Sequence, residues 1–165
     1  TDWIEDIMLR TAGPEAYSQW IDHRLPFSSP QVVRAFDEFG KILRSPQYID
    51  GGADNTVTTA FNEAPDGLFN NPPDCYLHKQ ASFITEFFQE DKIPRSDYDV
   101  FPLPGIDDRF GTPILVSGAA FGMFNDGSDM MPSEVGTGTF WSGMVDFAKG
   151  ASTTEGTKEI DASWP

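Results

Sequence analysis

Hydrophobic residues recur at helical spacing in several stretches of this chain, and the clearest stretch lies between two prolines. From Pro30 up to Ser45-Pro46 the apolar positions return every three or four residues, at Val32, Val33, Phe36, Phe39, Ile42 and Leu43. Ser29 and Pro30 form a typical helix start, because serine caps free N–H groups and proline needs no N–H in the first turn. The pattern predicts a helix whose apolar face is core.

The same spacing predicts further helices on both sides of this one. They cover residues 2–10, the stretch from Pro14 to Ile21, residues 56–62 and residues 82–89, with a helix that begins near Thr139 and a last one after Ser152. We expect Thr137 or Thr139 to cap the helix near Thr139 with a hydroxyl. Ser152 and Glu155 have the spacing of a capping box. In the stretch 82–89 we expect Phe83, Ile84, Phe87 and Phe88 to be buried.

Three other stretches are more typical of short strands. They are Leu68-Phe69, the alternating positions between Tyr98 and Leu103, and the segment 112–125 with its β-branched start and small middle. Pro102 and Pro104 limit the second stretch to an edge strand, because proline donates no ladder hydrogen bond. Helices alternating with short strands favour an α/β fold.

One residue pair near the C-terminal third invites a functional interpretation. Phe140, Met144, Phe147 and Ala148 form one apolar helical face, and Trp141 points about 100° away from Phe140 around the helix axis. If Phe140 is core, Trp141 lies at the edge of that face, where its ring can stack on a flat, weakly polar ligand such as a sugar. The alternative is that Trp141 is simply more core.

The turn Thr11-Ala12-Gly13-Pro14 offers a second candidate. It presents free N–H groups beside Tyr17, an arrangement that can bind hydroxyl groups, although an ordinary helix connection has the same sequence. A rigid polar turn, Asn70 to Asp74, then projects the segment 75–79.

Charge and composition exclude several classes of function. The formal net charge is −15, with 11 basic and 26 acidic residues, so phosphate backbones and anionic lipids are repelled and nucleic-acid binding is not expected. A single cysteine, Cys75, excludes a disulfide framework and a cysteine-based zinc site. His23 and His78 are too isolated to predict a metal site. No apolar run approaches the roughly 20 residues of a membrane span.

Catalytic motifs are missing from the sequence. It contains no GxSxG elbow, no Walker loop and no GxGxxG after a predicted strand. Glycosidase chemistry needs two carboxylates facing a cleft, but with 26 acidic residues some pair always fits, so such a pair carries almost no weight. We expect no catalytic residue, no metal and no cofactor.

The order of these stretches resembles a known family, the extracellular solute-binding proteins (family 1) of bacterial carbohydrate ABC transporters, the class that contains maltose-binding protein. More narrowly it is similar to the α-glucoside type. The resemblance rests on DWIEDIMLRTAGPEAY, VVRAFDEFGKIL, TAFNEAPDGLFNNPPDCYLHKQASFI, DYDVFPLPGI with LVSGAAFGMFND, and DMMPSEVGTGTFWSGMVDFAKG. No single motif is diagnostic, but the ordered set covers nearly the whole chain.

The resemblance implies a fold of two α/β lobes with sugar held between them, of which this chain is the second, C-terminal lobe only. We therefore expect one domain over 1–165, a single lobe of a type II periplasmic-binding-protein fold with a mixed, short-stranded sheet flanked by helices. Two chain segments, 1–126 and 128–165, meet near Asp126-Gly127-Ser128, where the family has a long returning segment. We expect Thr1 to lie just after the first crossing between lobes, and any targeting segment to lie outside this sequence.

The resemblance also implies ligand-binding residues, in three regions and on the cleft floor. They are Arg10, Thr11, Gly13 and Tyr17; Tyr76, Leu77, His78 and Lys79, with Cys75 beside them; Trp141; and Ser117 with Gly118 on the floor. The implied mechanism is stacking on the sugar ring face with a few polar clamps, followed by lobe closure.

The leading hypothesis is thus a non-enzymatic sugar-binding lobe of the substrate-binding component of a carbohydrate ABC import system, for an oligosaccharide or α-glucoside. Its partners would be the permease subunits, and its location periplasmic or extracellular, with a lipid anchor as an option in the full-length protein. Two alternatives stay open: a domain of a carbohydrate-active enzyme, or an interaction lobe that docks on the permease while the missing half sets ligand specificity.

Overall fold

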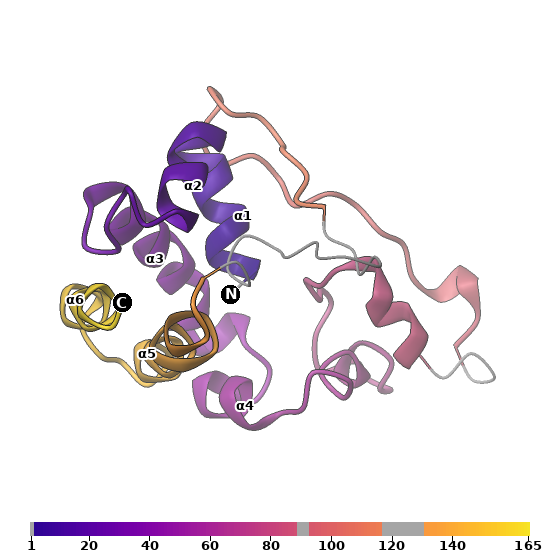
Figure 1. The fold of residues 1–165 in the computed structure, drawn as a ribbon. Coiled ribbons are helices and arrows are strands. Elements are labelled where there is room, and N and C mark those ends of the chain that lie inside the picture. The colour runs from indigo at the N-terminus through magenta and orange to yellow at the C-terminus, as the bar shows by residue number, and fades with distance from the viewer. Residues whose placement is uncertain (1, 89–92, 117–130) are drawn as a thin grey trace.

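The computed structural model describes residues 2–88, 93–116 and 131–165, which are built from helices and loops (Figure 1). The α-helices are α1 (Asp2–Thr11), α2 (Gly13–Ile21), α3 (Pro30–Leu43), α4 (Gly52–Thr58), α5 (Trp141–Ala148) and α6 (Thr153–Ala162). The 3-10 turns are η1 (Pro46–Tyr48), η2 (Asp66–Leu68), η3 (Ser82–Phe87) and η4 (Arg95–Asp97). A π-helical segment, η6 (Glu134–Phe140), runs directly into α5.

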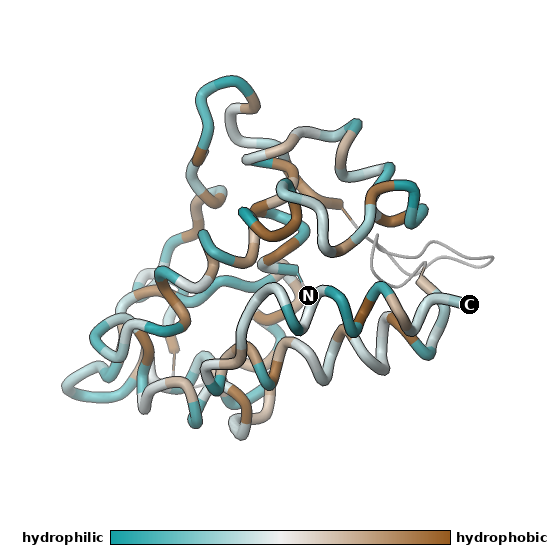
Figure 2. The backbone as a smooth tube through the Cα atoms, turned by 90° about the vertical axis from the view of Figure 1, so that its left-hand side faces the viewer, coloured by the Kyte–Doolittle hydropathy of each residue, from teal (hydrophilic) through white to brown (hydrophobic). Residues whose placement is uncertain are grey.

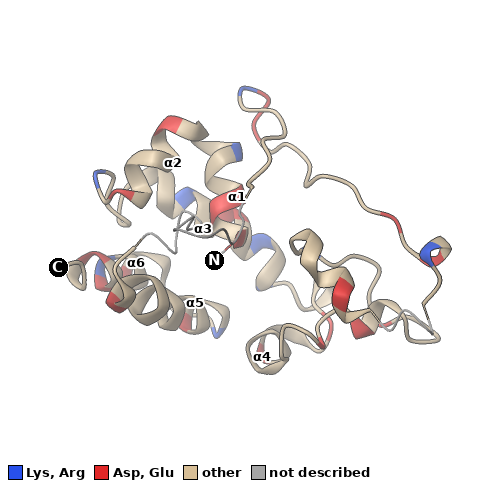
Figure 3. Cartoon of the chain, turned by 45° about the vertical axis from the view of Figure 1, so that its right-hand side comes forward, with Lys and Arg blue, Asp and Glu red and all other residues tan. Residues whose placement is uncertain are grey.

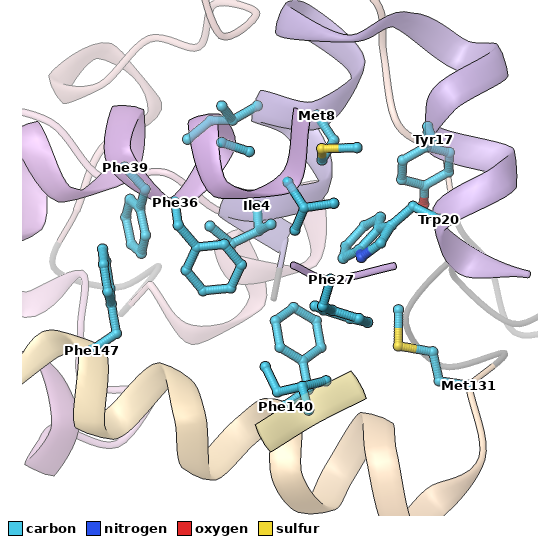
Figure 4. Close-up of a cluster of buried hydrophobic side chains, with 14 of the residues drawn as sticks. Ile4, Met8, Tyr17, Trp20, Phe27, Phe36, Phe39, Met131, Phe140 and Phe147 are labelled. Atoms are coloured by element: carbon cyan, nitrogen blue, oxygen red, sulfur yellow. The ribbon is translucent and has the colours of Figure 1, made fainter. Parts of the chain in front are cut away.

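A helical body is formed by α1, α2, α3, α5, η6 and α6, which pack around one hydrophobic core. Aromatic rings meet edge to face at its centre (Figure 4), with ring centroids 5.3 Å apart for Trp20 and Phe27 and 5.2 Å apart for Phe27 and Phe140. Rings bury large apolar areas, and edge-to-face pairs add to that gain. The core therefore joins the first 43 residues to the last 35, through helices far apart in the sequence.

The helices of the body follow the pattern of apolar residues closely. Along the chain, hydrophobic and hydrophilic residues alternate at short intervals (Figure 2), so that each helix has one face for the core. The predicted helices at 2–10, from Pro14 and from Pro30 are confirmed as α1, α2 and α3. Phe140, Phe147 and Ala148 are buried, as the spacing in the C-terminal third predicts.

The last helix is fixed to the first half of the chain by one carboxylate. Asp161 of α6 accepts hydrogen bonds from the backbone N–H groups of Phe27 (2.6 Å) and Ser28 (2.9 Å), and its Oδ1 lies 3.2 Å from His23 Nε2. Burial alone would raise the pKa of Asp161, but these hydrogen bonds outweigh burial and lower it. The ionised form thus holds α6 beside the loop that precedes α3.

An arm, described at residues 59–88 and 93–116, leaves the body after α4 and returns along α1 and α2 (Figure 1). It has aromatic clusters of its own: Phe61, Phe83 and Phe87 meet edge to face, as do Phe69, Phe88 and Tyr98. Many of its apolar side chains are nevertheless exposed. The arm is therefore less closely packed than the body.

The predicted α/β fold with a mixed sheet is wrong for the residues that the structure describes, because none of them forms a β-strand. Leu68 ends a 3-10 turn in which Phe69 N–H donates to the Asp66 carbonyl (3.0 Å). Residues 98–104 and 112–116 are extended but pair with no strand.

The physical reason lies in where the backbone groups of these extended segments go. Pro102, Pro104 and Pro113 have no N–H to donate, and the carbonyls of Leu103, Pro104 and Pro113 accept from the guanidinium of Arg10. A side chain has taken the place of a neighbouring strand. The segment 117–125, predicted as the rest of a strand, lies outside the described residues.

Other local predictions also need correction. The helix expected at 56–62 is α4, which begins at Gly52 and ends at Thr58, and the stretch expected as helix at 82–89 is the 3-10 turn η3 with Phe83 and Phe87 exposed. The side-chain caps predicted for the helix near Thr139 and for the helix after Ser152 are absent. No side chain caps the N-terminus of η6, α5 or α6. Thr137 instead donates to the Ser133 carbonyl (2.9 Å), as a threonine inside a helix can do.

Removing the Arg10 guanidinium should cost far more stability than removing an exposed charge. Arg10→Met leaves three loop carbonyls without their donor and the buried Asp6 carboxylate with Lys79 as its cation, so we expect a loss of about 3–5 kcal/mol in the free energy of unfolding. Urea denaturation followed by far-UV circular dichroism measures it.

The matched control is Lys41→Met, because Lys41 pairs with Glu38 (2.6 Å) at an exposed surface. We expect a change of about 0.5 kcal/mol or less for this variant. Equal losses for the two variants would contradict a special role for Arg10.

Candidate functional site

Arg10 is the most completely bonded polar residue of the candidate set. It is 2% exposed, and each of its five N–H donors has an acceptor: Nε the Pro104 carbonyl (3.0 Å), Nη2 the carbonyls of Leu103 (3.0 Å) and Pro113 (2.9 Å), and Nη1 the carbonyl (3.0 Å) and Oδ1 (2.8 Å) of Asp6. A guanidinium has five donors in total. Arg10 therefore holds the arm against α1 and has no donor left for a ligand.

The rest of the Thr11–Pro14 turn is occupied by the same returning part of the arm. Asp107 N–H donates to the Arg10 carbonyl (3.2 Å), and the Phe110 ring lies against Gly13. Thr11 is buried and donates its hydroxyl to the Ile7 carbonyl (2.8 Å). The surface that the sequence suggests for ligand hydroxyls is thus covered by residues 107–110.

Asp107 is held in place by its own charged neighbours. Hydrogen bonds from Arg109 keep the pKa of Asp107 well below its usual range, and Arg34 lies 3.7 Å away. Asp107 is therefore ionised at neutral pH, and in this state it accepts the hydrogen bonds from Arg109 within the loop that covers the turn.

Tyr17 lies inside the body rather than on a ligand-facing surface. It is 9% exposed, packs at 5.9 Å from Trp20 in an edge-to-face contact, and donates its hydroxyl to Glu5 Oε2 (2.7 Å). Glu5 is fully buried, and its Oε1 has no hydrogen-bond partner. The pair joins α1 to α2.

The segment 75–79 presents its side chains in two opposite ways. Tyr76 and Leu77 are 83% and 72% exposed, while Lys79 turns inward and its Nζ lies 2.7 Å from Asp6 Oδ2 and 5.6 Å from the centre of the Trp3 ring. His78 is half-buried, its Nε2 has no partner, and burial lowers its pKa. Burial first, and then Asp50 and Asp74, raise the pKa of Cys75, so its thiol is not activated.

Trp141 is exposed, and its neighbour Phe140 is not. The indole is 59% exposed at the first residue of α5, whereas Phe140 is fully buried among Trp20, Phe27 and Phe36. The π-helical segment η6 directly precedes it, and π-helical turns occur frequently at functional sites. The interpretation of Trp141 as a further core residue is thus excluded.

Ser117 and Gly118, predicted for the cleft floor, lie outside the described residues, as does the joint near Asp126-Ser128. The structure instead adds Asp6, whose two carboxylate oxygens bind Arg10 and Lys79. Its pairing with Arg10 at i, i+4 is a spacing that the sequence displays. Its pairing with Lys79 has no local signal.

Charged residues are spread over the helices and the arm (Figure 3). Within the described residues no group of three or more His, Cys, Asp or Glu side chains could hold a metal ion. Among the described helices, none has the length and apolar character that a bilayer crossing requires.

Comparison with known proteins agrees with the resemblance seen in the sequence. The chain is 38% identical over 224 residues to the "Osmoprotective compounds-binding protein GgtB" of Synechocystis, and 33% identical over 225 residues to the "Alpha-glucosides-binding periplasmic protein AglE" of Rhizobium meliloti. This chain is a homologue of bacterial solute-binding proteins. The alignments take in 100% and 99% of it. No protein-family model and no solved structure matches it.

The chain spans about half the length of these relatives, 53% of GgtB and 49% of AglE. The alignment with GgtB runs over 224 positions but holds only the 165 residues of this chain, so 59 positions have no residue opposite them. GgtB therefore has residues within the matched region that this chain lacks.

Gly13 should tolerate no side chain, for two separate reasons. Its φ is +84°, and a Cβ built on it would lie 2.5 Å from the Phe110 ring. We expect Gly13→Ala to destabilise by about 2–4 kcal/mol, from backbone strain and overpacking together. Gly52, with φ +76° and no atom within 4 Å of a Cβ, is the matched control that carries the strain alone.

Chemical denaturation of Gly13→Ala and Gly52→Ala compares the two costs directly. We expect Gly52→Ala to cost less, and the double variant Gly13→Ala/Phe110→Ala to show coupling between the two positions. Equal losses for the two single alanine variants would show that Phe110 does not press on the turn.

His78 should make stability depend on pH. The pKa of His78 is lowered from 6.5 in the folded state by burial. Well above pH 6.5 the imidazole is therefore neutral in both the folded and the unfolded chain. As the pH falls below 6.5, His78 binds a proton in the unfolded chain before it does so in the folded chain. The free energy of unfolding should therefore fall as the pH drops from 7.5 to 5.5. Denaturant titrations should show that the free energy of unfolding falls less with pH in His78→Gln than in the unaltered chain. The control His23→Gln keeps His78, so it should keep that part of the pH dependence.

Proposed function

We propose that this chain is the sugar-contacting lobe of the substrate-binding component of a carbohydrate ABC import system, and that it is not an enzyme. The proposal rests on Trp141, an exposed indole next to a fully buried phenylalanine, in a chain whose relatives are named for binding α-glucosides and osmoprotective compounds. Sugar rings bind to such surfaces by placing their C–H faces on the indole.

The roles of the other candidate residues divide by exposure. Tyr76 and Leu77 have exposed side chains that can line a ligand surface, and His78 lies between them and the half-buried Lys79. Arg10, Thr11, Gly13 and Tyr17 form the support, because their polar groups are used within the chain. Ser117 and Gly118 stay in the proposal as predicted cleft residues.

A single lobe provides one wall of a binding site, so weak binding is expected. Ligand pockets usually enclose most of the ligand surface. The homologous positions missing from this chain support the proposal that two segments, 1–126 and 128–165, are joined where a returning segment is absent. In the full-length protein we propose a periplasmic or extracellular location, a second lobe and permease subunits as partners.

The test is a titration of neutral α-glucosides, maltose and trehalose, followed by NMR on the indole N–H signals. The signal of Trp141, assigned by its loss in Trp141→Ala, should shift with sugar, and that variant should weaken binding about tenfold. Stability should change by only about 0.5 kcal/mol, because the indole is largely exposed.

The matched control is Tyr48→Ala, which removes an aromatic ring with 66% exposure in the 3-10 turn η1. We expect it to leave the titration unchanged. Sugar-dependent shifts that survive in Trp141→Ala, or that are equally lost in Tyr48→Ala, would contradict the proposal. Sugar binding by the full-length protein without any shift of the Trp141 signal would favour a lobe that docks on the permease.

A further inference from the structure

Asp6 connects two separate parts of the arm to the same point of α1. Its Oδ1 accepts from Arg10 (2.8 Å), which binds the carbonyls of Leu103, Pro104 and Pro113, and its Oδ2 lies 2.7 Å from Lys79 Nζ. The side chains of Asp6 and Arg10 are 11% and 2% exposed, and that of Lys79 is 19% exposed. One carboxylate thus connects Lys79 and the carbonyls of Leu103, Pro104 and Pro113, which lie in separate parts of the same arm.

The charges of this cluster are largely withdrawn from water, which makes the pairing specific. A mostly buried carboxylate is stabilised by both cations, because each contact compensates part of the hydration that burial removes. Lys79 also lies over the Trp3 ring, which stacks on Phe39 at 5.3 Å, so the ammonium has an aromatic face beside it. The Lys79 side chain therefore has a defined position on the body.

The neighbours of Lys79 in the sequence are the exposed Tyr76 and Leu77, which have little packing of their own. Tyr76 and Leu77 take part in no ring contact or hydrogen bond among those of the described residues, and their backbone lies in a segment without helix or strand. Their location thus depends on where the chain is anchored, three residues further on at Lys79 and before them at the Gly67 carbonyl, which accepts from Cys75 N–H (3.4 Å).

We propose that the Asp6–Lys79 ion pair positions the segment 75–79, so that Tyr76 and Leu77 are presented to the ligand. Lys79 then acts as a positioning residue and not as a ligand contact. The ligand part of this inference rests on the proposed sugar-binding function, whereas the positioning part stands on the ion pair alone.

The experiment compares Lys79→Met, Lys79→Arg and the unaltered chain by limited chymotrypsin digestion with mass-spectrometric mapping of the cuts. Loss of the ion pair frees the segment, so the cut after Tyr76 should become about fivefold faster in Lys79→Met, since cleavage follows local opening. Lys79→Arg keeps the charge and should restore the original rate. The cut after Tyr48, which is exposed and remote from the pair, is the internal control and should not change.

A sugar titration of the same three proteins completes the test. Maltose affinity should fall in Lys79→Met and return in Lys79→Arg, measured at a temperature at which all three proteins are folded. An unchanged cut after Tyr76 in Lys79→Met would overturn the proposal. Equal acceleration of the cuts after Tyr76 and Tyr48 would overturn it too, because it would indicate global destabilisation.

The two proposals fail in distinguishable ways. A faster Tyr76 cut in Lys79→Met, with no maltose response in the unaltered chain, would support the positioning role and contradict sugar binding by this lobe. A maltose response that Lys79→Met leaves unchanged, despite a freed segment, would keep sugar binding and overturn the presentation of Tyr76 and Leu77.

Discussion

The buried guanidinium of Arg10 is the interaction on which the arrangement of this molecule depends. A cation that is 2% exposed is stable only when its donors are satisfied, and here three of the five acceptors are carbonyls of the arm. The dependence is mutual, because proline-rich extended backbone without a neighbouring strand needs a donor for its own carbonyls. Helix α1 and the returning arm therefore form one structural unit.

This use of polar groups inside the chain determines what the candidate surface can recognise. Arg10, Lys79 and Tyr17 all bind acceptors within the protein, so the described candidate residues with largely exposed side chains are Trp141, Tyr76 and Leu77. Trp141, Tyr76 and Leu77 offer ring faces and an aliphatic side chain, with no free cation among them. Such groups suit the C–H face of a neutral ring better than an anionic ligand, and the net charge of −15 acts in the same direction.

The sequence predicts the helical body well because its information is local. Apolar residues at helical spacing identify α1, α2, α3 and the face of α5, but they leave open whether Trp141 is buried like Phe140 or exposed. The arm is predicted poorly, since extended segments become strands only if distant partners supply the hydrogen bonds. Nothing near Leu103 or Pro113 in the sequence indicates that Arg10 will take that place. No local sequence pattern indicates the pairing of Asp6 with Lys79 either, although Asp6 and Arg10 have the spacing of a helical ion pair.

Body and arm are thus held by different kinds of force. Burial of rings such as Trp20, Phe27 and Phe140 gives the body its stability, but hydrophobic contact has little directional preference. The arm has less burial to rely on, and its location is defined by the planar fork of a guanidinium and by one ion pair. A planar fork fixes direction as well as distance. Asp6 and Arg10 of α1 therefore contribute most by orienting the arm, including its exposed segment 75–79. Their net effect on stability is a separate question from that orientation.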